Sequence, residues 1–249
     1  MSASRPAAVA GRFYPDDAAD LAAIVDDFVA VADPGAAAST APKAIIAPHA
    51  GYPYSGPIAA SAYACVQVAA IERVVMFAPA HRWSVAGLAL PESTAFENPL
   101  GTVPLDAEAA QRARRFDFVE TIDAAHVEEH AIEVQLPFLQ RRLPHGFHLV
   151  PFVVGQATPD QVEAVMEELW GGVETLIVVS SDLSHFHDYD TARRIDADTS
   201  AAIENLSPQS LQEGGACGRV PIQALLSVAV RRGLTARTVV VGYGAYVIG

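Results

Sequence analysis

Two histidines follow short apolar runs of the sequence at nearly the same relative position. His49 comes soon after residues 43–46, and His81 comes soon after residues 73–77. If both runs form neighbouring strands of a parallel sheet, the two imidazole rings project from the same edge of that sheet. Neutral imidazole is the commonest side-chain ligand of transition metals. The pair therefore predicts a divalent transition-metal site.

A cysteine in a glycine-rich stretch is the expected third ligand. Cys217 lies within residues 214–218, Gly-Gly-Ala-Cys-Gly, where no packing requirement explains a thiol. A loop flanked by glycine can approach an ion closely, and the metal would hold the sulfur as a thiolate. The other cysteine, Cys65, lies in an alanine-rich helical pattern and is predicted to be a small core residue.

A third apolar run ends in residues that can handle protons. Residues 175–180 are followed by Ser181 and Asp182, and His185 lies one turn further on. We expect Asp182 and His185 to hold a histidine ring or to move protons to a bound ligand. The alternative for each histidine is an ordinary loop residue, and only the recurrence at three strand ends favours a site.

Three further titratable residues are given smaller roles. His126 and His130 flank a Glu-Glu pair before a helix, where they are expected to cap that helix or to pair with carboxylates. Glu133 lies on the same helix, and the pattern leaves open whether it faces the pocket or is a surface carboxylate.

Strands and helices alternate along the chain and must position these residues. The expected helices run from the Asp16–Asp17 cap to about residue 31 and over residues 57–68, 106–116, 129–143, 159–169, 190–206 and 220–232. Residues 88–91 and 96–103 suggest a local antiparallel hairpin. The alternation predicts a single domain over residues 1–249, a three-layer α/β/α fold with a mainly parallel central sheet.

Composition limits the partners of the protein. The 249 residues are 51% hydrophobic, which is enough for a sizeable core, and the only loose segment is roughly residues 33–42. A net charge of -13 repels phosphate backbones, so nucleic acid is not expected as a partner. No apolar run approaches the roughly 20 residues that span a membrane. Residues 1–10 lack a signal-peptide pattern, so we expect a cytoplasmic protein with reduced thiols.

Five segments, in order along nearly the whole chain, resemble the successive signatures of the Memo family. They are VAGRFYP at residues 9–15, APHAGYPYSGP at 47–57, EHAIEVQLPF at 129–138, SSDLSH at 180–185, and CGR at 217–219 with Pro221–Ile222. The resemblance implies the fold of the catalytic subunit of class III extradiol ring-cleaving dioxygenases, a three-layer α/β architecture with a pocket at the strand ends.

The resemblance also implies a ligand set. His49, His81 and Cys217 match the family's metal-binding positions, and Asp182 and His185 match positions that line the pocket. The dioxygenases hold non-haem iron with two histidines and a glutamate. With Cys217 in the place of that carboxylate, the site is softer and favours iron or copper, and an oxidisable thiolate argues against ring cleavage.

Known members of the family suggest partners for this chain. Animal members bind phosphotyrosine-containing receptor peptides and are linked to copper and iron redox chemistry. Bacterial members are often named as component B of the AmmeMemoRadiSam system, together with a radical SAM protein. The resemblance therefore implies a small-molecule or peptide ligand and a radical SAM protein as a partner.

One segment departs from the family pattern. Members usually carry a polar, Gly- and Ser-containing loop before the final Val-Val-Gly-Tyr strand, whereas here residues 234–237 run almost directly into residues 240–243. If the loop is absent, one wall of the pocket is expected to be open.

Two functions remain as hypotheses. The first is a mononuclear iron or copper protein acting in redox or oxygen chemistry, with ligands His49, His81 and Cys217. The second is a binding module without chemistry, in which the same cleft, with Tyr52, Tyr54 and Arg82 at its rim, captures a peptide or another acidic ligand. Arg82 favours the second hypothesis because a guanidinium can bind carboxylate or phosphate through two hydrogen bonds.

Overall fold

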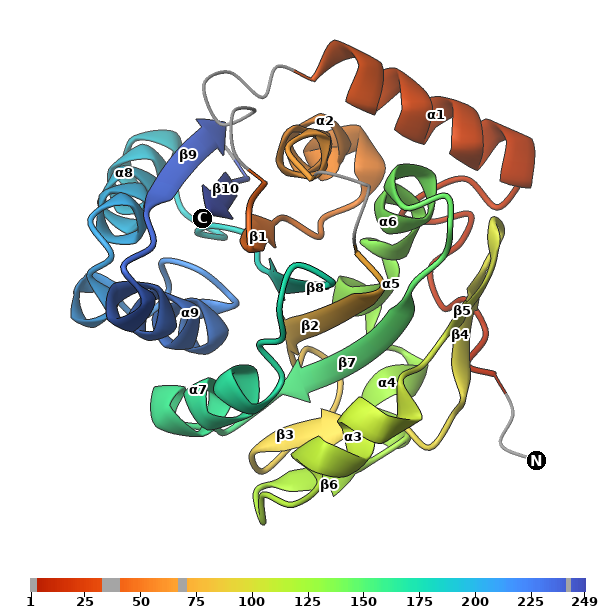
Figure 1. The fold of residues 1–249 in the computed structure, drawn as a ribbon. Helices are drawn as coiled ribbons and strands as arrows, with labels where there is room; N and C mark the ends of the chain where they lie inside the picture. The colour runs from red at the N-terminus through yellow and green to blue at the C-terminus, as the bar shows by residue number, and fades with distance from the viewer. Residues whose placement is uncertain (1–3, 33–40, 67–70, 241–242) are drawn as a thin grey trace.

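The computed structural model describes residues 4–32, 41–66, 71–240 and 243–249. Among these residues, eight strands form one sheet in the order β6-β3-β7-β2-β8-β1-β10-β9, and helices cover both of its faces (Figure 1). The strands are β1 (Ala44–Ala47), β2 (Arg73–Pro79), β3 (Leu88–Leu90), β6 (Val119–Thr121), β7 (His148–Val154), β8 (Thr175–Ser180), β9 (Ala236–Val240) and β10 (Ala245–Ile248). The three-layer α/β/α fold expected from the sequence is confirmed.

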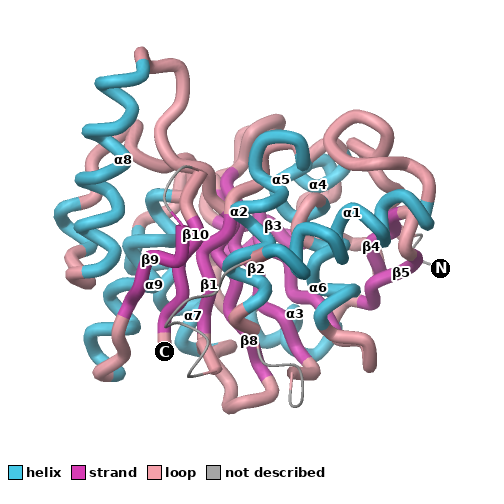
Figure 2. The backbone as a smooth tube through the Cα atoms, turned by 90° about the horizontal axis from the view of Figure 1, so that it is seen from above, coloured by secondary structure: helices cyan, strands magenta, loops and turns pink. Residues whose placement is uncertain are grey.

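The centre of the sheet is parallel and its edges are antiparallel. Strands β7, β2, β8 and β1 run in the same direction. At one side β10 and β9 pair antiparallel with their neighbours, and at the other side β3 pairs antiparallel with β7 but parallel with the edge strand β6. Figure 2 shows β9, β10 and β1 together at one end of the molecule and the small hairpin of β4 (Ala95–Asn98) and β5 (Gly101–Pro104) at the other. The carboxyl ends of β1, β2 and β8 therefore meet at one edge.

Each face of the sheet has its own layer of helices. The first layer holds α1 (Ala18–Val31), α2 (Tyr52–Ala64), α4 (Ala124–Val127), α5 (His130–Glu133) and α6 (Leu136–Arg142). The second holds α3 (Ala107–Ala113), α7 (Pro159–Glu168), α8 (Tyr189–Glu204) and α9 (Arg219–Arg232), with the 3-10 turn η2 (Pro208–Ser210).

Strand residues alternate between two hydrophobic cores. In β1, Ile45 packs under the first layer and Ile46 under the second, and Val178 and Val179 of β8 divide in the same way. All four side chains are buried because both faces are covered, which explains why these strands are continuous apolar runs. Cys65 is buried in the first core, as predicted.

The predicted hairpin was wrong in its pairing. β3 belongs to the central sheet, between β6 and β7, and the hairpin forms within the second predicted segment, where β4 pairs with β5. Leu88 and Leu90 are fully buried in the second core, so this short strand is stabilised by the sheet rather than by a local turn. Periodicity alone does not reveal which partner a strand takes.

The predicted helix over residues 129–143 is broken in two. α5 ends at Glu133, and α6 begins at Leu136 with Pro137 in its first turn. Proline has no N–H to donate and its ring clashes with the preceding turn, so the helix restarts there. The break leaves α5 as a single helical turn, and α4, which precedes the predicted helix, is a single turn as well. Most of the loose segment predicted at residues 33–42 lies outside the described residues.

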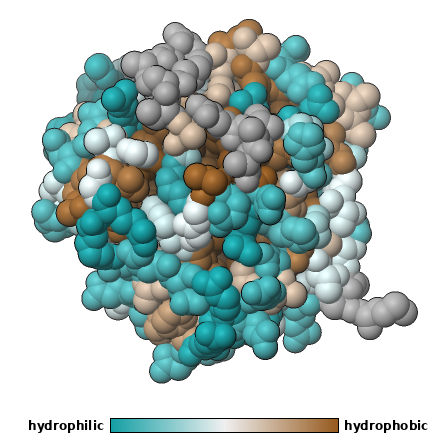
Figure 3. Space-filling model, viewed as in Figure 1, coloured by the Kyte–Doolittle hydropathy of each residue, from teal (hydrophilic) through white to brown (hydrophobic). Residues whose placement is uncertain are grey.

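The surface is largely hydrophilic on the face seen in Figure 1, with hydrophobic residues in small groups (Figure 3). In the described part of the chain, no helix has the length and apolar character needed to cross a bilayer.

Candidate metal centre

A cavity of about 540 Å³ opens at the carboxyl ends of the parallel strands. Its walls include His49, His81, His130, Asp182, His185 and Cys217. All five residues predicted for the site are therefore together, and His130 joins them. The five come from three strand ends and one loop, and the common direction of β1, β2 and β8 brings the strand ends to one place.

Three imidazole rings form the floor of the cavity. The ring centroids are 5.1 Å apart for His49 and His81, 5.5 Å for His49 and His130, and 4.8 Å for His81 and His130. One nitrogen from each ring lies within 4.8 Å of the others, which makes the three histidines a group that can hold a metal ion.

His49 is held by Ser180, whose hydroxyl proton is already donated to another acceptor. Its Nδ1 lies 2.8 Å from Ser180 Oγ. Ser180 donates to the carbonyl of Ala131 at 2.7 Å and accepts from Gln135 Nε2 at 2.8 Å. A hydroxyl has one proton, so Ser180 must accept from His49 Nδ1. The Nε2 of His49 is left facing the cavity, which is the orientation that a metal requires.

His81 is held in the same tautomer by a buried carboxylate. Glu129 accepts from the His81 backbone N–H at 2.7 Å and lies 2.9 Å from its Nδ1. Burial would raise the pKa of Glu129, but the hydrogen bond and charge of His81 outweigh it and lower the pKa to about 2. Glu129 is therefore ionised and can only accept, so His81 donates from Nδ1 and its Nε2 faces the cavity.

His130 is the site residue that sequence reasoning missed. It was expected to pair with a carboxylate, and its Nδ1 does lie 3.4 Å from Glu129, but its ring also faces His49 and His81. Burial lowers the pKa of His130 to about 4, so the imidazole is neutral near pH 7. The search for residues at strand ends could not find it because it lies on the helical turn α5.

Backbone contact places Cys217 against the end of β8. The Cys217 sulfur accepts from the Asp182 backbone N–H at 3.2 Å, and the Cys217 N–H donates to the Asp182 carbonyl at 3.2 Å. Gly218 donates to Ser181 Oγ at 2.8 Å, and a Cβ at Gly218 would lie 2.6 Å from the Ser181 Cβ. Only glycine allows the two loops to come this close.

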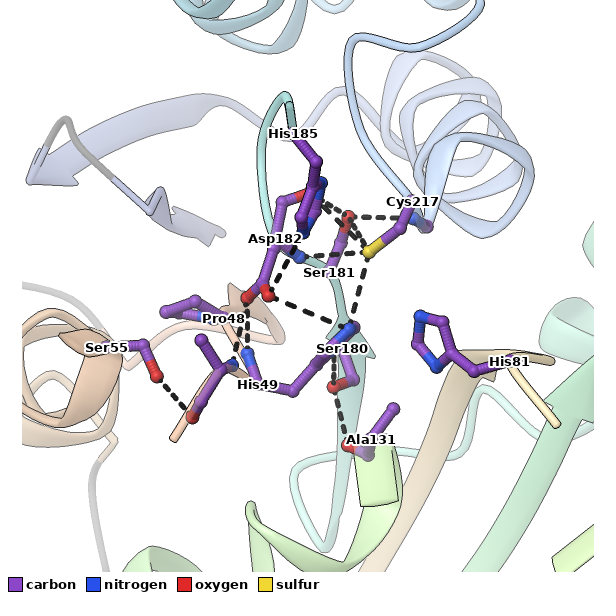
Figure 4. A network of polar contacts seen from close by, with 12 residues as sticks. Pro48, His49, Ser55, His81, Ala131, Ser180, Ser181, Asp182, His185 and Cys217 are labelled. Carbon is purple, nitrogen blue, oxygen red and sulfur yellow. Dashed lines mark hydrogen bonds and ion pairs between the residues drawn. The ribbon is translucent and has the colours of Figure 1, made fainter. Parts of the chain in front are cut away.

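The Cys217 sulfur faces the histidines rather than an apolar wall. It lies 3.4 Å from His49 Nε2, and the His81 ring lies beside that of His49 on the same side of the sulfur (Figure 4). Burial would raise the pKa of Cys217, but the charge and hydrogen bonds of His49 and His81 lower it to about 6. Burial likewise opposes a rise in the pKa of His81, which hydrogen bonds to Cys217 and Glu129 bring to about 10.

Asp182 and His185 form a pair at the mouth of the cavity. Asp182 Oδ1 accepts from the backbone N–H groups of His49 at 2.6 Å and Ala50 at 3.2 Å, and its Oδ2 lies 3.5 Å from His185 Nε2 (Figure 4). Burial would raise the pKa of Asp182, but His49 and His185 lower it, so the group is a carboxylate. The hydrogen bond to Asp182 raises the pKa of His185.

Three residues considered for the cavity, Glu133, Tyr52 and Tyr54, do not line it. Glu133 is fully buried and paired with Arg5, so it is neither a pocket residue nor a surface carboxylate. Tyr52, predicted at the rim, is buried with its hydroxyl donating to the carbonyl of Val134. Tyr54 is exposed on α2, and Arg82 lines the cavity as predicted.

Fold and site together define a class: α/β proteins with a histidine-lined cavity at the carboxyl ends of parallel strands. The sequence profile of one family, described as Memo-like protein, matches residues 5–246. The chain belongs to this family.

Relatives described as MEMO1 family proteins cover most of the chain. One from Ignicoccus hospitalis is 37% identical over 223 residues, which are 84% of this chain and 78% of the relative. One from Aquifex aeolicus is 34% identical and covers 83% of this chain and 77% of its own length. One from Aeropyrum pernix is 32% identical and covers 98% of this chain and 97% of its own length.

Proposed function

We propose that the protein binds one transition-metal ion through His49, His81 and Cys217, and that this ion is iron or copper acting in redox or oxygen chemistry. The observation that carries the proposal is the 3.4 Å separation of Cys217 Sγ and His49 Nε2. Two donors of one tetrahedral ion, with typical metal–nitrogen and metal–sulfur bonds, lie about 3.6 Å apart. This distance supports Cys217 and His49 as two donors of one ion.

The hydrogen bonds of the two rings and the state of the sulfur support the same donor set, and a metal would displace the proton that the raised pKa of His81 keeps on its ring in the metal-free protein. His49 and His81 each commit Nδ1 to a buried partner, and the lowered pKa of Cys217 makes it a thiolate near neutral pH. Imidazole and thiolate donors suit iron and copper better than hard cations such as magnesium. When bound, such a metal supplies one-electron chemistry and a position for oxygen or another small ligand.

The remaining polar residues handle the ligand and its protons. Asp182 orients the backbone of His49, and His185, with a raised pKa, is placed to hold a proton at the mouth of the cavity. His130 is neutral and adjacent, so it competes with Cys217 for the place of third donor. A radical SAM protein as partner rests on the family resemblance alone.

Metal analysis tests the proposal. Protein prepared without chelators should carry about one iron or copper per chain, and His49→Ala should abolish it. Cys217→Ser should lower the metal content, whereas Cys65→Ser, a matched change at the buried core cysteine, should not. Loss of metal in His130→Ala together with full retention in Cys217→Ser would assign the third donor to His130.

Oxygen consumption separates the reaction classes. Uptake of oxygen with catechols would identify a ring-cleaving enzyme, and uptake only with a reductant would identify a redox protein. A wild-type protein that carries no metal after exposure to iron and copper would contradict the proposal.

A second candidate function is the binding of an anionic ligand without chemistry. Arg82 favours it, because its side chain is exposed, lines the cavity and forms no ion pair among the residues that the structure describes. A peptide or small molecule with a carboxylate or phosphate could occupy the same cavity. Affinity for phosphotyrosine peptide that survives the loss of all three proposed ligands would support this function over the first.

A further inference from the structure

Two single helical turns carry much of the site, and neither can satisfy its own backbone. α4 spans residues 124–127 and α5 spans residues 130–133. A helix leaves its last four carbonyls without partners inside the helix, so a helix of four residues depends on donors from elsewhere. Unpaired buried carbonyls cost free energy comparable to a lost hydrogen bond.

The guanidinium of Arg5 supplies these donors. Its Nε donates to the carbonyl of His126 at 2.8 Å, and its Nη2 donates to the carbonyls of Glu129 at 2.7 Å and Val127 at 3.4 Å. Its Nη1 pairs with Glu133. The side chain is buried, although arginine is almost never fully buried unless paired. One side chain thus bridges both helical turns.

Glu133 also binds the N-terminal segment, through residues that follow Arg5. Besides Arg5, its carboxylate accepts from the backbone N–H groups of Ala8 at 2.8 Å and Val9 at 3.0 Å and from the hydroxyl of Tyr14. Burial and the charge of Glu133 raise the pKa of Tyr14, so the phenol keeps its proton and donates. The buried charge of Glu133 is therefore fully compensated, as it must be.

The opposite side of these turns is the metal centre. Glu129 fixes the tautomer of His81, His130 faces the cavity, and the carbonyl of Ala131 takes the proton of Ser180, which in turn holds His49. The side-chain hydrogen bonds of Arg5 are therefore all on the backbone, or on the carboxylate, of the segment that positions the histidines. Its guanidinium also lies 5.0 Å from the centre of the Phe96 ring, and its backbone pairs with Ala95 and Glu97 of β4.

We propose that Arg5 is a positioning residue for the metal centre: the Arg5–Glu133 pair docks the N-terminal segment behind α4 and α5 and thereby sets the positions of Glu129 and His130. This inference rests on the proposed function. A rigid second layer of contacts commonly changes metal affinity although it never touches the ion. Arg5 was invisible to sequence reasoning because it lies more than a hundred residues from its partners.

Arg5→Lys is the decisive variant. Lysine keeps the positive charge beside Glu133, but a single ammonium group cannot reproduce the planar fork that reaches several carbonyls. The matched control is Arg141→Lys, because Arg141 also pairs with a carboxylate, that of Asp26, through two hydrogen bonds on the exposed surface. Tyr14→Phe, which removes one hydrogen bond from Glu133 and leaves all charges, is the milder second variant.

Two readouts distinguish positioning from stability. Competition with a coloured chelator should show that Arg5→Lys binds cobalt(II) about tenfold more weakly than wild type, that Tyr14→Phe falls between the two, and that Arg141→Lys is unchanged. In metal-free protein, nuclear magnetic resonance should show the His81 Nδ1 proton, hydrogen bonded to Glu129, as a slowly exchanging signal. That signal should shift or disappear in Arg5→Lys, shift less in Tyr14→Phe and stay unchanged in Arg141→Lys.

The outcomes separate the two proposals. Wild-type cobalt affinity and an unchanged His81 signal in folded Arg5→Lys would overturn the positioning role. A wild-type protein that binds no cobalt would overturn the metal proposal, and the His81 signal would still decide the role of Arg5. If Arg5→Lys does not fold, Tyr14→Phe becomes the deciding variant. A wild-type cobalt affinity together with a wild-type His81 signal in Tyr14→Phe would then refute the inference.

Discussion

The cavity has two walls that differ in how firmly their side chains are held. The inner wall consists of His49, His81 and His130, and the first two each have Nδ1 bound to a buried partner with several further hydrogen bonds. The outer wall consists of Arg82, His185, Phe186 and His187, which are exposed. The side chain of His185 is 39% exposed and has one carboxylate partner, whereas those of His49 and His81 are 2% and 29% exposed, so the walls differ more in hydrogen bonding than in exposure.

This difference indicates that the two walls have different roles. Metal ligands must be held in one tautomer and one orientation, and the inner wall provides this. A ligand that enters and leaves needs side chains that can move, and the outer wall provides these. Phe186 is fully exposed and has a positive φ of 63°, an uncommon backbone conformation that fits a residue shaped by function more than by packing.

The largest expected effect concerns His126, which lies behind the inner wall. Burial lowers its pKa to about 4 from an ordinary 6.5, so the unfolded chain binds this proton at a higher pH than the folded one. The folded state therefore loses about 3 kcal/mol of stability from this group as the pH falls from 6.5 to 4.

Replacing His126 with glutamine tests that value. Between pH 6.5 and pH 4 the free energy of unfolding of the variant should fall by about 3 kcal/mol less than that of wild type. Urea unfolding at the two pH values measures this difference. His187→Gln, at the exposed outer wall, should follow wild type. If the free energies of unfolding of wild type and His126→Gln fall equally with pH, the lowered pKa of His126 is contradicted.

The second effect concerns the partner of His81. Glu129→Gln removes the charge that fixes the His81 tautomer, and metal affinity should fall between about ten- and a hundredfold. Glu128→Gln, at the exposed neighbouring residue, is the control and should leave the affinity unchanged. Titration of metal-free protein with cobalt(II) measures both. Equal affinities for the two variants would remove the distinction between the walls.

The smallest effect is expected at the outer wall. His185→Gln should change metal affinity by less than about threefold, because exposed ion pairs contribute little. The same cobalt titration provides the measurement. A loss as large as that of Glu129→Gln would make His185 part of the metal-binding group.

Much of the fold followed from local sequence patterns. The runs at residues 73–77 and 175–180 are buried strands, and Asp17 caps α1 as its position suggested. The pairing of Leu88–Leu90 with β7 could not be predicted, because a three-residue strand takes its partner from the assembled sheet. The break before α6 was visible in principle, since Pro137 stands within the predicted helix.

The site was predictable where it depends on strand ends. His49, His81 and Asp182 follow parallel strands, so the direction of the sheet brings them together. Glu129 and Arg5 act through contacts between distant segments, and nothing local distinguishes them from ordinary surface charges. The side chains that hold the ligands were thus harder to predict than the ligands.

The origin of the donors in distant parts of the chain has a consequence for folding. His49, His81, His130 and Cys217 come from separate segments, and no two share an element. Loops that join such segments must close before the donors can meet, so capture of an ion would be a late event in folding. A bound ion would then slow the unfolding of the native protein. Fragments of the chain, which lack some of the donors, would be unable to compete for scarce metal.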